Sequence, residues 1–232
     1  MLAEHRIHLG HVPALTIGAG PTVLLLHGLG ASAEVQRAEA IALAEQGFRA
    51  IALDAPHHGA RRDAWLDEME HLGPPESHVR LLRQVREAAA EIPGVIDRLG
   101  GEVGLVGISM GAYTALAAAT EDARVRATVS ILGSPDWSPR AGPITEEMAA
   151  LMAHAPARRP AACARRPLLL ANAGRDGWVP ARWSRDFVRG LDPALAARVS
   201  YVEYPESDHF MRGEDWHDLW AKTIAFLKRH AA

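Results

Sequence analysis

Short apolar runs alternate with longer amphipathic stretches along most of the chain. The runs are hydrophobic at nearly every position, which is typical of strands buried on both faces of a sheet. We expect such strands at 22–27, 48–53, 103–108, 127–132, 167–171 and 199–204. The stretches between them predict helices at 33–46, 77–99, 111–120, from about Pro180 onward and at 216–229, with Pro93 as a kink or break.

This alternation predicts an α/β fold with a mostly parallel central sheet and helices on both faces. The segment 6–17 precedes the first parallel strand, and we expect it to add an antiparallel hairpin at one sheet edge. The chain has 232 residues, enough for one well-buried domain and few for two. Residues 1–232 are therefore predicted to form a single domain.

Two segments, 56–77 and 134–166, interrupt the alternation with prolines, glycines and polar residues. Each follows the carboxyl end of a predicted strand, where open α/β sheets bind their ligands. The second segment contains one apolar helical stretch, at 145–154, and is typical of a short lid or cap. The alternative is a variable connection without a catalytic role.

Composition narrows the class of protein. With 25 basic and 28 acidic residues the net charge is −3, which favours neither nucleic-acid binding nor a polybasic membrane anchor. Cys163 is the single cysteine, so no internal disulfide can form. Residues 4–6 are polar where a secretion signal needs an apolar core, and the apolar runs are far shorter than the ~20 residues of a membrane helix. We expect a cytoplasmic protein whose oligomeric state is open.

The residues 107–111 read Gly-Ile-Ser-Met-Gly and match the G-x-S-x-G pattern, between a predicted strand and a predicted helix. A serine on so tight a turn needs small neighbours two residues before and after it, here Gly107 and Gly111. The turn places Ser109 at a helix N-terminus, which stabilises developing negative charge. We predict that Ser109 is a nucleophile; the alternative is a simple strand-to-helix turn.

Where a nucleophile stands on such a turn, the acid and the base follow it in chain order. His209 lies in a short loop between the last strand and the last helix, where it can reach over Ser109, so we predict it as the base. Asp176 follows the preceding strand and is predicted to orient His209. The competing residues are His154, His217 and His230 for the base, and Asp186, Asp192 and Asp208 for the acid.

Acyl transfer also needs two N–H donors for the oxyanion. The residues 27–30 read His-Gly-Leu-Gly and follow the first parallel strand, so the backbone amides of Leu29 and Met110 are the predicted donors. Gly28 lets the backbone approach the substrate. His27 is expected to brace this loop rather than to act as a second base.

Taken together, these motifs resemble those of the α/β-hydrolase superfamily over residues 22–227. The further stretch Asp54-Ala-Pro-His-His-Gly59 is similar to that of small bacterial carboxylesterases near the dienelactone-hydrolase and prolyl-oligopeptidase-like branches. This resemblance implies an α/β-hydrolase fold and hydrolysis of short acyl esters. Dienelactone hydrolase itself has a cysteine at the elbow where this chain has Ser109, which favours an esterase over that lactonase.

The functional hypothesis is a carboxylesterase-type serine hydrolase that acts on a small ester of short to medium acyl chain through an acyl-enzyme, without a cofactor. A thioesterase, lactonase, amidase or perhydrolase could use the same residues, and a catalytically silent binding protein is the alternative from another class. No metal is expected at Asp54, His57 and His58, because their spacing fits no standard site; Asp54 is expected to brace its turn. The predicted pocket walls are Gly28, Trp137, Met148, Met152, Trp178, Phe210 and Met211.

Overall fold

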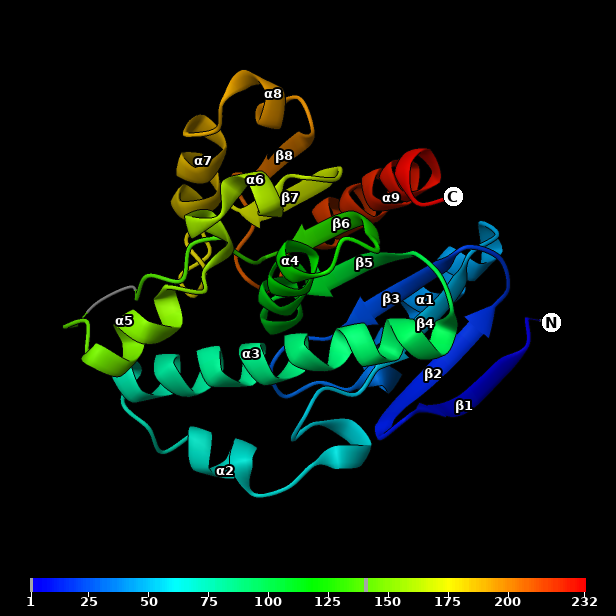
Figure 1. Cartoon of the computed structure of the whole chain (residues 1–232), viewed down its shortest axis with the longest axis horizontal. Coiled ribbons are helices and arrows are strands. Elements are labelled where there is room, and N and C mark those ends of the chain that lie inside the picture. Colours follow the sequence, from blue (N-terminus) through cyan, green and yellow to red (C-terminus); the bar gives the residue numbers. More distant parts are fainter. Residues whose placement is uncertain (1, 140–141) are drawn as a thin grey trace.

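The computed structural model describes residues 2–139 and 142–232, and its centre is one twisted sheet (Figure 1). The strands of this sheet are β1 (Glu4–Leu9), β2 (Val12–Gly18), β3 (Thr22–Leu26), β4 (Arg49–Leu53), β5 (Val103–Ile108), β6 (Val125–Ile131), β7 (Leu168–Ala173) and β8 (Val199–Tyr204). Their order across the sheet is β1-β2-β4-β3-β5-β6-β7-β8. β1 pairs with β2 and β2 with β4 antiparallel, and every later pair is parallel.

The predicted fold class and the antiparallel hairpin at the sheet edge are therefore confirmed. The bounds of β5 and β8 match the expected runs residue for residue. Strand β3 is buried from its second residue to its last, as expected for a strand with helices on both faces.

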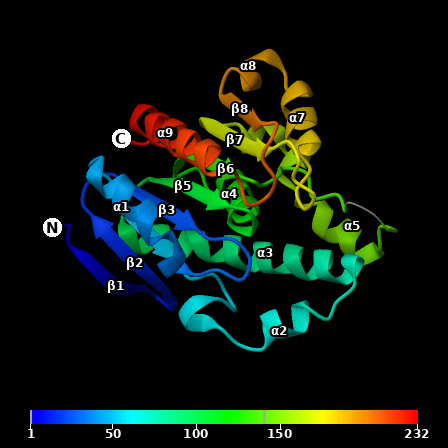
Figure 2. The same ribbon diagram turned by 180° about the vertical axis from the view of Figure 1, so that it is seen from behind.

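Helices cover both faces of the sheet, and Figures 1 and 2 show the two sides in turn. On one side α1 (Arg37–Glu45) and α9 (Gly213–His230) share a core with β2, β3 and β4. On the other side α3 (Pro74–Leu99) and α4 (Met110–Glu121) enclose a second core. The shorter helices are η1 (Ala33–Gln36), η2 (Gly59–Arg61), α2 (Trp65–Met69), α5 (Glu146–Met152), η3 (Pro156–Arg158), α6 (Pro160–Cys163), α7 (Ala181–Arg189) and α8 (Pro193–Ala196).

Helix α3 differs from the expectation at Pro93, because the helix runs unbroken through that residue. Proline removes one helical hydrogen bond, but here the flanking residues Ile92 and Val95 are buried in the core, and this packing keeps the helix continuous. The helix begins with prolines in its first turn and ends at Gly100, which has the left-handed conformation (φ 71°) common at helix ends.

Both interrupting segments pack against α3, the first through α2 and the second through α5. The first contains η2 and α2, and the second contains α5, η3 and α6. Helix α5 buries Met148 and Met152 in the same core as α3, so this part of the expected lid is packed against the domain. In the described part of the chain, no helix is both long and apolar enough to cross a membrane.

Candidate active site

Ser109 stands on the sharp turn between β5 and α4, with a strained backbone at φ 53° and ψ −117°. A side chain at Gly107 would place its Cβ 2.1 Å from the carbonyl oxygen of Gly111, and one at Gly111 would place it 2.0 Å from that of Leu26. Both glycines are therefore required by close backbone contact. The turn holds Ser109 at the first turn of α4, where the helix dipole favours negative charge.

His209 and Asp176 lie in line with this serine. His209 Nε2 is 2.9 Å from Ser109 Oγ, and His209 Nδ1 is 2.7 Å from Asp176 Oδ2. The Asp176 side chain is fully buried, and its other oxygen accepts hydrogen bonds from the backbone N–H groups of Trp178 and Val179, both at 2.8 Å. An ionised carboxylate can only accept, so Nδ1 carries the ring proton and Nε2 is left to accept from Ser109.

The loop that carries His209 is held from both sides. Ser207, which is fully buried, donates to Asp215 Oδ2 at 2.7 Å and accepts from the backbone N–H of Arg212 at 2.9 Å. Its carbonyl accepts from the N–H of Arg175 at 2.9 Å, which ties the loop to the one that carries Asp176. The sequence indicated Ser207 only as part of the motif around His209 and gave it no role of its own.

The candidate oxyanion donors, Leu29 and Met110, lie around the same cavity as Ser109. Neither N–H donates to another described residue. His27 orients the first of them. Its Nδ1 is 2.8 Å from the carbonyl oxygen of Gly28, and because the C=O and N–H of a trans peptide point in opposite directions, the Leu29 N–H points away from His27.

His27 and Asp54 brace two loops against each other, as expected. His27 Nε2 accepts from the N–H of Ala55 at 3.1 Å, so Nδ1 is the protonated nitrogen that donates to Gly28. Asp54 accepts from the N–H groups of Ala33 and Ala60, at 2.8 and 3.0 Å. Burial lowers the pKa of His27 to about 4, so the ring is neutral at physiological pH and both bonds persist.

This buried ring gives a pH-dependent stability. Because the folded pKa lies below the ordinary 6.5, the unfolded chain takes up the proton first as the pH falls, so stability is lost below about pH 6.5. From pH 7.0 to 5.5, wild type should lose about 1 kcal/mol more free energy of unfolding than His27→Gln. Urea unfolding at both pH values measures this difference. The exposed His8→Gln serves as control, and equal losses in wild type and His27→Gln would contradict the assignment.

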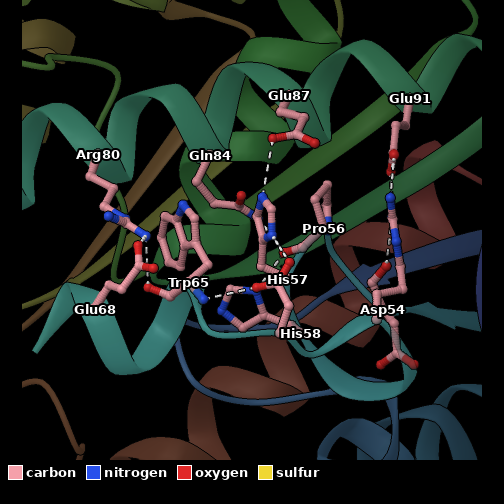
Figure 3. A network of polar contacts seen from close by, with 12 residues as sticks. Asp54, Pro56, His57, His58, Trp65, Glu68, Arg80, Gln84, Glu87 and Glu91 are labelled. Carbon is pink, nitrogen blue, oxygen red and sulfur yellow. Dashed lines mark hydrogen bonds and ion pairs between the residues drawn. The ribbon is translucent and has the colours of Figure 1, made fainter.

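The segment after β4 is fastened to α3 by a polar network (Figure 3). His57 contacts Asp63 and Glu87, at 2.7 and 3.5 Å, and its ring stacks on Trp65 with centroids 5.3 Å apart. From α3, Gln84 donates to the Pro56 carbonyl, Arg80 to the Trp65 carbonyl and Glu68, and Glu91 accepts from Arg61. These residues fix α2 beside the cavity, where Met69 lines the wall.

The cavity over Ser109 has a volume of about 920 Å³ and largely apolar walls. On one side it reaches η1 and the start of α1, and on the other the beginning of α3. Of the predicted substrate-binding residues, Gly28, Trp178 and Phe210 line it. Phe210 and Trp178 are exposed, and both rings pack beside the His209 imidazole.

The prediction that Trp137 lines the substrate pocket is wrong, because Trp137 is not among the residues around the cavity. Its side chain is fully buried in the core formed by α3, α4 and α5. The turn after β6 directs the chain into this core. In that turn the Ser134 hydroxyl accepts from the Asp136 N–H at 3.0 Å, and His78 Nε2 lies 2.9 Å from the Trp137 carbonyl oxygen. Met148 and Met152 are also core residues, because the buried side of α5 packs into the core that α3 lines. Met211 packs against the other core, which contains residues of α9.

Several cavity residues were missed by the sequence analysis. They share no motif, and only the spacing of the helices places them at the site: Gln36, Glu39, Met69, His78, Tyr113, Trp183 and Trp216. From the predicted lid, among described residues, Pro139 alone reaches the cavity.

Known proteins resemble this chain in sequence and in fold. The chain is 36% identical over 132 residues to a Bacillus subtilis (strain 168) protein named "Putative esterase YitV", an alignment that covers 51% of this chain and 47% of that one. The chain thus spans about half the length of the curated relatives it matches.

Among solved structures, TT1662 from Thermus thermophilus superposes with a TM-score of 0.76 and 25% identity, covering 99% of this chain and 98% of that one. A dienelactone hydrolase from Anabaena variabilis superposes with a TM-score of 0.67 and 21% identity, covering 100% and 99%; at that identity it indicates the fold alone. The family model for the alpha/beta hydrolase family matches residues 23–227. The chain belongs to the alpha/beta hydrolase family.

Proposed function

We propose that this protein is a serine esterase that hydrolyses small carboxylic esters through an acyl-enzyme on Ser109. The observation that carries the proposal is the hydrogen-bonded line from Asp176 through His209 to Ser109, at 2.7 and 2.9 Å, which opens into a largely apolar cavity. The esterase name of the relative YitV supports the same reaction class.

In the first half-reaction, Ser109 Oγ bonds to the ester carbonyl carbon while its proton moves to His209 Nε2. The carbonyl oxygen becomes an oxyanion that the N–H groups of Leu29 and Met110 stabilise. Collapse of this intermediate breaks the bond to the alcohol oxygen, which takes the proton from His209. The alcohol leaves, and the acyl group stays on Ser109.

In the second half-reaction, water gives a proton to His209 and attacks the acyl carbon. A second oxyanion forms on the same two donors, and its collapse returns the proton to Ser109 and releases the acid. Buried Asp176 holds the His209 ring in the required tautomer and stabilises the imidazolium in both halves.

A panel of substrates that share a four-carbon acyl chain tests the reaction class. We expect p-nitrophenyl butyrate to have a higher kcat/KM than the butyryl thioester of N-acetylcysteamine, γ-butyrolactone and the p-nitroanilide of butyric acid. Preference for the thioester, lactone or anilide would replace the esterase assignment with the corresponding hydrolase. An alkyl fluorophosphonate provides a readout independent of substrate choice, and a folded protein that neither labels nor turns over any of the four would be a binding protein instead.

A further inference from the structure

The cavity wall formed by η1 and α1 carries polar groups without partners. Gln36 lines the cavity and is only 2% exposed, yet among the described residues neither its Oε1 nor its Nε2 has a hydrogen-bond partner. Glu39 lines the same cavity, and its Oε2 is buried and likewise unpartnered within the described chain. Gln36 ends η1 and caps α1, and Glu39 lies three positions later in the first turn of α1.

Such groups are costly where they serve only the fold. Buried polar atoms are nearly always hydrogen-bonded in proteins, and an apolar residue at position 36 would avoid the cost of the unpaired amide. The nearby wall is otherwise apolar, with Leu29, Ala31 and Val35 preceding Gln36 in the chain. An unpaired amide and an unpaired carboxylate oxygen in an apolar wall of the cavity that contains Ser109 are typical of a site that binds a polar group.

The two side chains define what they can bind. The Gln36 amide both donates and accepts, whereas the Glu39 carboxylate accepts when ionised. Among described residues no cation pairs with Glu39; Arg37, two positions earlier, instead pairs with Glu4 at 2.6 Å. Burial raises the pKa of Glu39, as it does for a carboxyl group that lacks a cationic partner. The subsite therefore favours groups with N–H or O–H donors and repels a carboxylate.

We propose that Gln36 and Glu39 form a subsite for an uncharged substrate group that both donates and accepts hydrogen bonds, such as a carboxamide or a hydroxyl. The inference rests on the proposed esterase function and adds the substrate class: esters that carry such a group on the acyl or alcohol side. An anionic end group at the same position is rejected by Glu39.

Three p-nitrophenyl esters of equal size test the subsite: the 5-methylhexanoate, its isosteric carboxamide (glutaramate) and its carboxylate (hemiglutarate). Butyrates of alcohols with the same three end groups test the alcohol side. In one of the two series we expect kcat/KM to be about tenfold higher for the carboxamide than for the isopropyl group. Gln36→Leu should bring this carboxamide-to-isopropyl ratio close to one. Glu39→Gln should raise kcat/KM for the carboxylate substrate relative to that for the isopropyl substrate.

The controls make the same changes outside the cavity. Gln46→Leu and Glu45→Gln alter exposed residues of the same region and should leave both ratios as in wild type. Because Gln36→Leu removes an unpaired buried amide, its Tm should equal or exceed that of wild type, whereas a purely structural Gln36 would lower it. If Gln36→Leu does not fold, Glu39→Gln alone decides through the carboxylate ratio.

The outcomes separate the two proposals. If the variants change kcat/KM equally for all three end groups, or if wild type shows no carboxamide preference in either series, the side chains hold only solvent and the subsite is wrong. If no protein in the set, wild type included, hydrolyses p-nitrophenyl butyrate, the esterase function fails and not only the subsite.

Discussion

Replacing Ser109 with alanine should lower kcat for p-nitrophenyl butyrate by at least about 10⁴-fold, with the fold intact. Alanine removes the one oxygen that lies 2.9 Å from His209 Nε2, and no other hydroxyl occupies that position among the described contacts. Without it the acyl-enzyme cannot form, and the remaining rate comes from the oxyanion donors and binding alone. Steady-state kinetics at saturating ester measure the loss.

The control for this variant is Ser200→Ala, which removes an exposed hydroxyl on β8 that does not line the cavity. It should keep the wild-type rate. The Tm of Ser109→Ala should also match wild type, because alanine keeps the strained turn that Gly107 and Gly111 make possible. A Ser109→Ala enzyme with a rate within tenfold of wild type would remove Ser109 from the mechanism.

Asp176→Asn should lower kcat by about 10³- to 10⁴-fold at neutral pH. The reason is the fixed direction of the side chain. Because Asp176 Oδ1 accepts from two backbone N–H groups at 2.8 Å, asparagine must keep its oxygen there and turn its NH₂ group toward His209 Nδ1. Nδ1 then has to accept, the ring proton moves to Nε2, and His209 can no longer take the proton of Ser109.

The matched control is Asp208→Asn, at the exposed residue next to His209. Asp208 accepts from the Phe210 N–H at 2.9 Å, a bond that the asparagine oxygen can keep, so the rate should stay near wild type. Kinetics of the two variants on one ester discriminate between the two aspartates. A large loss in Asp208→Asn with none in Asp176→Asn would reassign the acid.

The features that sequence predicts well here are local ones. The apolar runs of β5 and β8 and the Gly107–Gly111 turn depend on neighbours within a few residues, so pattern and spacing suffice to locate them. Chain order then narrows the choice of His209 and Asp176, because strand ends meet at one edge of a parallel sheet.

The features that sequence misses are set by packing between distant segments. Trp137 is predicted as a pocket residue because it follows a strand end, but it packs in a core with residues of α3 and α5. Pro93 reads as a break, yet the core on both sides of it keeps α3 continuous. Gln36 belongs to no motif, and only the position of η1 beside the cavity gives it a candidate role.

The central claim is that the acyl group of an ester passes through a covalent bond to Ser109. The most direct test is to mix the protein with excess p-nitrophenyl butyrate, quench in acid within the first turnover, and map the butyryl mass by peptide mass spectrometry. We predict one butyryl group, located on Ser109 and absent from Ser109→Ala. Steady turnover with no butyryl group on the chain, or with the group on another residue, would contradict the account.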